Sequence, residues 1–184
     1  MIRHKISILF VLFILVLMDQ TTYAQDSPRH EIGIRLTGLE DFDFVYKKEK
    51  QLNRFFRHRL GLVNLQASGN SNATLWSFGL GYAFGIENRK SINEKLLFIH
   101  GFEPRMAVDY SSFEGQAQNW AFQIGIGYVL GFHYEFAEAF YVSIEAIPAV
   151  TFTRSKSSQN GFAENNFQAG FSSNAVALTL AYRF

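Results

Sequence analysis

The sequence predicts an all-β fold, an eight-stranded antiparallel up-and-down transmembrane β-barrel preceded by a cleaved signal peptide. Three observations support this prediction. Large apolar residues recur at every second position in eight segments of the chain. The residues between them are mostly small or polar, which is typical of strands with one apolar face. After the N-terminal leader, no run approaches the roughly 20 apolar residues that a transmembrane helix needs.

The N-terminal leader has the layout of a secretory signal peptide. A basic start at residues 3–5 precedes an apolar run from Ile6 to Met18, and small residues lead up to Ala24. We expect cleavage after Ala24, which divides the chain into a signal peptide (1–24) and one outer-membrane β-barrel domain (25–184). The chain has no cysteine, so an exported domain would carry no disulfides. Its 17 basic and 16 acidic residues nearly balance, so the composition does not predict a nucleic-acid partner.

The first three expected strands are the least regular. Residues 30–38 alternate Ile32 and Ile34 with polar or small residues, and residues 42–49 alternate aromatic residues with Asp and Lys. In residues 54–66, His58 and Asn64 interrupt the apolar face. These interruptions leave the strand boundaries between residues 30 and 66 open.

The remaining five segments alternate more strictly. The clearest is "WAFQIGIGYVLGFHY" (120–134), in which large apolar residues alternate with Ala, Gln, Gly, Val and His. The five ranges are 76–86, 96–110, 120–134, 140–152 and 173–184. Between the segments we expect turns and loops, because these stretches are rich in Gly, Asn, Ser and charge. The longer ones are "ASGNSNAT" (67–74), "ENRKSINEK" (87–95), "SSFEGQAQ" (111–118) and "KSSQNGFAENNFQAG" (156–170).

The apolar face is expected to point outward, into lipid. An eight-stranded barrel has an interior only wide enough for a filling of side chains, so it cannot hold this many Phe, Tyr and Trp residues. The opposite face is also too poor in Lys and Glu for a water-exposed surface. With the barrel turned inside out, the apolar residues meet acyl chains, and closure satisfies every backbone group within the hydrocarbon.

The lumen is expected to hold a network of charged and polar groups. Three of the strands turn large polar residues inward, whereas their neighbours turn in Gly, Ala, Ser and Thr. We therefore expect the charged groups to cross the lumen above the glycines of the neighbouring strands and to pair there, because unpaired buried charges are costly. The predicted network consists of Arg57, Arg59, Glu103, Arg105, Asp109, Tyr141 and Glu145.

Aromatic residues are placed as two interfacial belts. Trp76, Tyr110, Trp120 and Phe152 are assigned to one rim, and Tyr134 and Phe140 to the other. The first rim borders the loops 67–74, 111–118 and 156–170 and is therefore expected to be extracellular.

The last nine residues, "VALTLAYRF", carry a family resemblance. They resemble the C-terminal assembly signal of Gram-negative outer-membrane barrels, which the barrel-assembly machinery reads. The positions that carry this resemblance are Val176, Leu178, Leu180, Tyr182 and Phe184. The whole predicted domain resembles the small eight-stranded outer-membrane protein β-barrel family of the OmpX and OmpA-transmembrane type. The resemblance implies a location in the bacterial outer membrane, in contact with its lipid.

For function we expect a porin-like outer-membrane barrel whose lumen is closed by packed polar side chains. Its role would be structural or interactive, as a monomer whose extracellular loops meet an unidentified ligand. One alternative is a narrow channel for small solutes or ions, and a less favoured one is a lipid-modifying barrel enzyme. No catalytic residue, cofactor or metal is predicted, since the histidines of the domain show no ligand spacing.

Two further stretches leave alternatives open. The basic run "KKEKQLNRFFRHR" (47–59) is either a solvated periplasmic turn or a contact with lipid phosphates through Lys47, Lys48, Lys50 or Arg54. In the loop 156–170, Phe162 and Phe167 either form a binding surface or fold back on the rim.

Overall fold

The computed structural model describes residues 29–37, 42–70, 73–113, 118–158, 162–171 and 176–184. The predicted signal peptide and its cleavage site lie outside these residues. Within the described part of the chain, no helix has the length and apolar character needed to cross a membrane.

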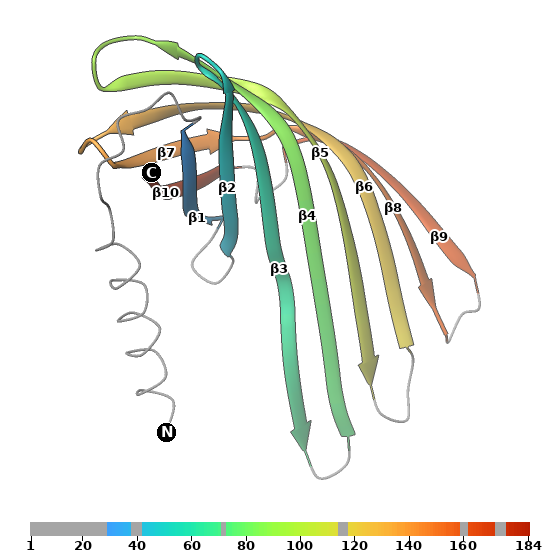
Figure 1. Cartoon of the computed structure of the whole chain (residues 1–184). Coiled ribbons are helices and arrows are strands. Elements are labelled where there is room, and N and C mark those ends of the chain that lie inside the picture. Colours follow the sequence, from blue (N-terminus) through green and yellow to red (C-terminus); the bar gives the residue numbers. More distant parts are fainter. Residues whose placement is uncertain (1–28, 38–41, 71–72, 114–117, 159–161, 172–175) are drawn as a thin grey trace.

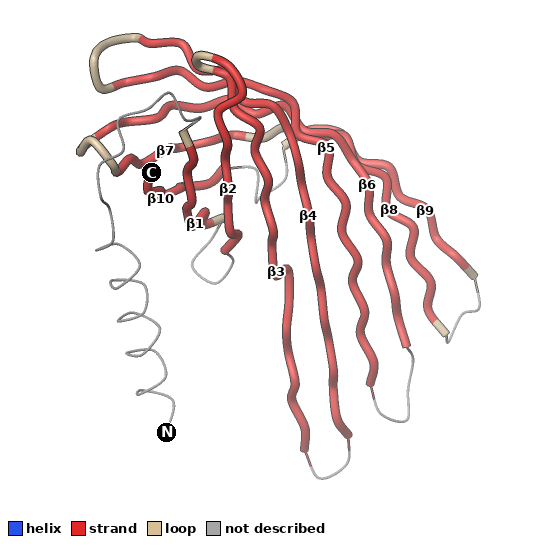
Figure 2. Tube along the Cα trace, viewed as in Figure 1, coloured by secondary structure: helices blue, strands red, loops and turns tan. Residues whose placement is uncertain are grey.

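The described residues form ten antiparallel strands (Figures 1 and 2). They are β1 (His30–Leu36), β2 (Phe42–Gln51), β3 (Arg54–Asn70), β4 (Ala73–Ser91), β5 (Leu96–Phe113), β6 (Gln118–Glu135), β7 (Phe140–Ala146), β8 (Ala149–Ser157), β9 (Ala163–Gly170) and β10 (Val176–Arg183). β7 and β8 both pair with β6. β10 pairs with β7, and β9 pairs with β8. The ten strands therefore make the eight expected positions in the wall.

The barrel closes between its first and last strands. β1 pairs with β10 from Glu31–Arg183 to Leu36–Leu178. The backbone of His30 also exchanges two hydrogen bonds with that of Phe184, at 2.9 and 3.0 Å. Together with the β5–β6 pairing, this seam makes a complete ring of β1 to β7 and β10.

The seventh strand of the wall is interrupted at Ile147 and Pro148, between β7 and β8. Proline lacks a backbone N–H and cannot donate to the ladder. The carbonyl oxygen of Pro148 still accepts a hydrogen bond from the backbone N–H of Tyr128 at 2.9 Å, so pairing with β6 continues across the break. The side chain of Ile147 is buried at this point.

Among the described residues, the strands close into a barrel at one end of the molecule only (Figure 1). We call this end, which carries Arg29, Phe184 and the turns 51–54, 91–96 and 135–140, the turn end. β2 pairs with β3 only as far as Gly61, and the rest of β3 pairs with β4 alone. Among the described strands, β9 pairs with β8 alone. At the opposite end, which we call the far end, β3, β4, β5, β6, β8 and β9 therefore continue as a curved open sheet.

Four stretches that the sequence predicted as loops are partly strand, so their assignment as loops was partly wrong. β3 and β4 cover most of residues 67–74, and β4 runs through residues 87–91. β5 continues to Phe113, and β9 occupies residues 163–170. The period-two signal fades there because neither face is strongly apolar, while backbone pairing with the neighbouring strand continues.

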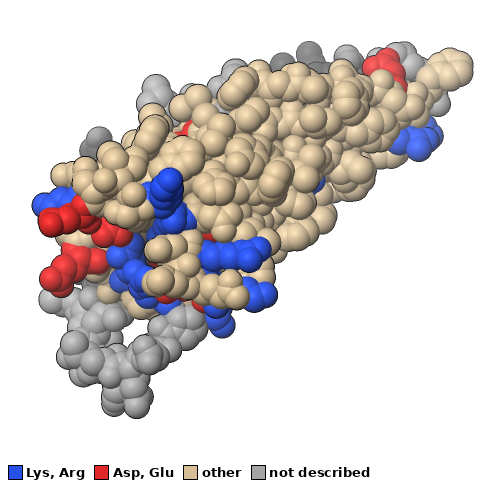
Figure 3. Space-filling view, turned by 90° about the horizontal axis from the view of Figure 1, so that it is seen from above, with Lys and Arg blue, Asp and Glu red and all other residues tan. Residues whose placement is uncertain are grey.

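The outer surface of the barrel is apolar. Alternate residues of β6 such as Ile124 and Ile126 are 44% and 49% exposed, whereas Val129 on the inner face is fully buried. Figure 3 shows a long body almost free of charged side chains, with most Lys, Arg, Asp and Glu residues gathered at one end. Exposed apolar area of this extent is suited to lipid and not to water.

Candidate functional site

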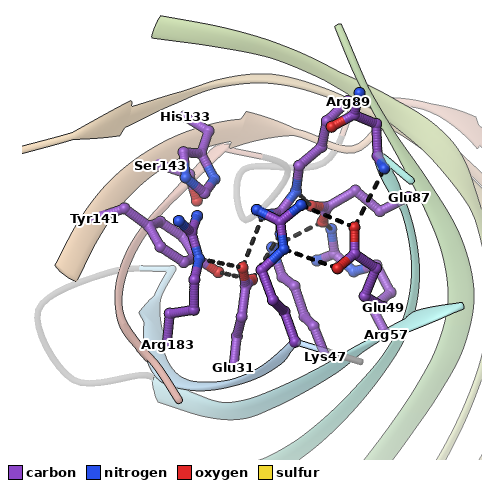
Figure 4. A network of polar contacts seen from close by, with 12 residues as sticks. Glu31, Lys47, Glu49, Arg57, Glu87, Arg89, His133, Tyr141, Ser143 and Arg183 are labelled. Atoms are coloured by element: carbon purple, nitrogen blue, oxygen red, sulfur yellow. Dashed lines mark hydrogen bonds and ion pairs between the residues drawn. The ribbon is translucent and has the colours of Figure 1, made fainter. Parts of the chain in front are cut away.

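The lumen of the closed half is filled by a network of charged and aromatic side chains (Figure 4). The network draws on strands from every part of the ring, so it forms only when the barrel closes. Its charged members are Glu31, Arg35, Asp43, Lys47, Arg57, Arg59, Glu87, Arg89, Glu103, Arg105, Glu135, Glu145 and Arg183.

Arg57 lies at the centre of the network and is 1% exposed. Its guanidinium contacts three carboxylates: Glu145 at 2.8 Å, Glu87 at 3.1 Å and Glu103 at 3.1 Å. These carboxylates come from β7, β4 and β5. One side chain of β3 therefore ties together three other strands across the lumen.

Towards the turn end, Glu31 is the second centre. Arg89 binds it with two parallel hydrogen bonds of 2.6 and 2.8 Å, a geometry that favours Arg over Lys. Arg183 and the hydroxyl of Tyr141 also donate to the Glu31 carboxylate, at 3.2 and 2.7 Å. The ammonium of Lys47 lies 2.7 Å from Glu87 and connects this layer to the centre.

Towards the far end the network has two well-paired cations and one that is loosely paired. Arg59 contacts Asp43 at 2.6 Å and Glu103 at 2.7 Å, and Arg35 contacts Asp43 at 3.1 Å. Arg105 reaches Glu103 only at 3.9 Å, and its side chain is 22% exposed. Arg105 is thus the member that faces the open half of the lumen.

Glycines on neighbouring strands make room for these side chains. Arg57 pairs in register with Gly85, and Glu145 with Gly131. A Cβ on Gly127 would overlap the guanidinium of Arg105. The spatial relation expected from the sequence, charged side chains beside the glycines of adjacent strands, is the one observed.

The structure brings six of the seven predicted network residues together. The six are Arg57, Arg59, Glu103, Arg105, Tyr141 and Glu145. The placement of Asp109 in the network was wrong. Asp109 pairs in register with Gly79 and Ala121, in the far half of the sheet, and no ion pair joins it to the network within the described residues.

Sequence reasoning missed several members of the network. Lys47 was interpreted as part of a solvated or lipid-contacting run, but it is 1% exposed and points into the lumen. Glu87 and Arg89 were assigned to a turn, but they extend β4 inside the barrel. The alternation of strand residues could have predicted the position of Lys47. Its neighbours Tyr46 and Lys48 face outward, so Lys47 must point inward.

Three of the described histidines face outward and are paired with tyrosines on adjacent strands. His30 lies 2.7 Å from the hydroxyl of Tyr46, His58 lies 2.8 Å from that of Tyr82, and His100 lies 3.3 Å from that of Tyr128. One ring nitrogen of each imidazole thus has a hydrogen-bond partner, which lowers the cost of placing His58 on an otherwise apolar face. His133 instead faces the lumen, stacked on Tyr141 with ring centroids 3.7 Å apart. No group of three metal-binding side chains occurs among the described residues.

The aromatic-belt residues lie on the outer face. Trp76, Trp120 and Tyr134 are 59%, 43% and 46% exposed. Tyr110, Phe152 and Phe140 are also outward-facing residues of β5, β8 and β7. The residues of the predicted assembly signal form the outward row of β10 and the C-terminus: Val176, Leu178, Leu180, Tyr182 and Phe184.

Taken as a whole, the network forms a plug of paired charges. Each of its carboxylates has at least one cationic partner, and its central members are almost inaccessible to solvent. Buried ions require this degree of pairing, because removing one partner leaves an uncompensated charge. The arrangement cross-links the wall of the barrel and fills its narrow interior.

Comparison with solved structures identifies the fold. A major outer membrane protein from Thermus thermophilus superposes with a TM-score of 0.51 and 9% identity, covering 85% of this chain and 99% of that one. Ail, the attachment invasion locus protein of Yersinia pestis, aligns with a TM-score of 0.45 and 12% identity over 85% of this chain and 95% of its own. No protein-family model matches the sequence, and no curated protein matches it significantly.

The chain is therefore an eight-stranded β-barrel of the outer-membrane type, as its sequence predicted. Barrels with an apolar outer band and a polar interior span bacterial outer membranes. The outward apolar rows and the ion-filled lumen of this chain have that construction, which places the protein in the outer membrane.

Proposed function

We propose that this protein is a closed outer-membrane barrel that acts through contacts made by its extracellular end. The observation that carries this proposal is the buried position of Arg57 among Glu87, Glu103 and Glu145, which blocks the lumen with paired charge. A lumen filled in this way supports a structural or interaction role over transport. The far end, with its open sheet, is taken as the extracellular end, because the chain termini of such barrels lie in the periplasm.

Support for an interaction role comes from the far end. All eight residues of β9 are exposed, including Phe167 at 70%, and Phe162 just before it is 81% exposed. Among the described strands, β9 pairs only with β8, so its other edge offers free backbone donors and acceptors. An exposed edge of this kind accepts an extended segment of another polypeptide by strand addition.

One observation favours a channel as the second candidate. Arg105 is the least tightly paired and the most exposed cation of the plug. It faces the open half of the lumen. A narrow conduit would require this layer to hydrate or move. Both functions share the same fold, so the lumen must be tested directly.

Planar-bilayer recording of the purified barrel separates the two candidates. The closed-lumen proposal expects no stable single-channel steps from the wild-type protein. Stable steps that disappear in Arg105→Ala would overturn it in favour of the conduit.

A site-specific photo-crosslinker tests the interaction role in living cells. A probe at Phe167 on β9 is expected to give a discrete protein adduct. The matched control is a probe at Phe152, its register partner on β8, which lies one strand inside the edge. Equal labelling from the two positions, or none from Phe167, would contradict strand addition at this edge.

A further inference from the structure

Four cations form a basic patch on the outer face at the turn end of the barrel. The basic patch consists of Lys48 and Lys50 on β2, Arg54 on β3 and Lys90 on β4, all exposed. Arg54 pairs in register with Gln51 on one side and Asn88 on the other. The patch therefore extends continuously over three adjacent strands, with neighbouring Cα atoms within about 5–8 Å.

The cations of the patch lack the acidic partners that the lumen cations have. Within the described part of the chain, no carboxylate forms an ion pair with Lys48, Lys50, Arg54 or Lys90. The nearby Glu49 is already engaged by Arg29 at 2.8 Å. Lys47, which directly precedes Lys48 in β2, points inward to Glu87. Alternation along one strand thus separates a cation used for the plug from cations that face the surroundings.

The patch continues directly from the lipid-facing surface. Lys50 places its ammonium 4.6 Å from the ring centroid of Phe56, which is itself outward and 37% exposed. Tyr46 and His58 form the next outward pair, and above them the row becomes apolar with Phe44 and Leu60. Cations at the edge of an apolar band reach the level of the lipid headgroups, with their aliphatic stems along the apolar surface.

We infer that the basic patch binds the phosphate groups of anionic phospholipids in the periplasmic leaflet. The inference rests on the proposed membrane-spanning arrangement, with the turn end in the periplasm. Four unpaired cations beside an apolar lipid-facing surface complement a ligand that joins a phosphate to acyl chains. A basic cluster at a membrane surface attracts such headgroups, each cation adding about fivefold to the binding constant.

The inference predicts a lipid preference that can be measured on the intact protein. The barrel is reconstituted into phosphatidylcholine vesicles that contain spin-labelled phosphatidylglycerol or spin-labelled phosphatidylcholine. Electron paramagnetic resonance then gives the immobilised fraction of each label. The wild-type protein is expected to immobilise the anionic lipid at least about fivefold more strongly. The variant K48Q/K50Q/R54Q/K90Q is expected to lose this preference, since all four side chains lie on the surface and do not contribute to the plug.

The matched control is the variant R154Q/K156Q. Arg154 and Lys156 are exposed cations of β8 near the far end, away from the basic patch. The control is expected to keep the preference. An equal loss in this variant would show a general charge effect and overturn the inference, as would a wild-type barrel that inserts but shows no preference. Failure of the wild-type barrel to float with the vesicles would instead contradict the membrane-spanning arrangement itself.

Discussion

Replacing Arg57 with alanine should destabilise the barrel far more than replacing an exposed arginine. Arg57 is 1% exposed and contacts Glu145, Glu87 and Glu103 at 2.8 to 3.1 Å. After its removal, Glu87 keeps Lys47 at 2.7 Å, and Glu103 keeps Arg59 at 2.7 Å.

Glu145 would be the carboxylate left without a close cationic partner; it would keep the hydrogen bond from the Ser143 hydroxyl at 3.3 Å. Its remaining cations are Arg35 at 3.7 Å and Lys47 at 3.9 Å, both beyond good hydrogen-bond distance. Removing one member of a buried ion pair typically costs 3–5 kcal/mol, so Arg57→Ala should lower the free energy of unfolding by about 3–5 kcal/mol. In the double variant R57A/E145Q the carboxylate without a partner is gone, so part of this loss should be recovered.

The assay is reversible urea unfolding of the barrel in lipid vesicles, followed by tryptophan fluorescence. Arg154→Ala serves as the control, because Arg154 is an exposed residue near the far end. A loss below about 1 kcal/mol for Arg57→Ala, equal to that of an exposed ion pair, would refute the view that the plug stabilises the barrel. The absence of any recovery in the double variant would show that Glu145 is not the group left uncompensated.

Three other substitutions test the wall of the barrel. Ile126→Arg places a charge on the lipid face and should cost about 2–4 kcal/mol in the same assay, whereas Ile126→Val should be nearly neutral; equal stability of the two would contradict the assignment of the outer face. Gly131→Val should cost about 1–3 kcal/mol, since its Cβ would lie only 3.0 Å from the Cα of Glu145; an unchanged midpoint would show that the wall can yield there. Deleting Phe184 should slow outer-membrane assembly in cells, and Phe184→Ala, which keeps the backbone bonds to His30, should do so too if the aromatic ring is the signal. Normal assembly of Phe184→Ala would assign the defect of the deletion to the closure seam.

The sequence by itself determined the wall of this protein. A period of two over eight segments requires strands, and the amount of Phe, Tyr and Trp on one face cannot fit inside a ring of eight strands. The assignment of the outer face followed from this volume argument together with the scarcity of Lys and Glu on the opposite face. The rows that include Ile124, Ile126, Leu178 and Leu180 are exposed as expected.

Strand lengths could not be read from the same signal. Beyond the apolar band both faces are polar, and strands such as β9 are held by backbone bonds that leave no trace in the side-chain pattern. The open sheet at the far end, and the edge of β9 that no other described strand pairs with, are therefore properties that only the strand pairing reveals.

Only the tertiary structure decided the partners within the lumen. Glu31 and Arg89 lie 58 residues apart in the chain, and Arg57 and Glu145 lie 88 apart, yet each pair is in direct contact. Alternation identifies which side chains point inward, but the strand register and the closure of the ring set their heights and their partners. Since charge pairing depends on distances of a few ångströms across the lumen, the network could be specified only once the ring had closed.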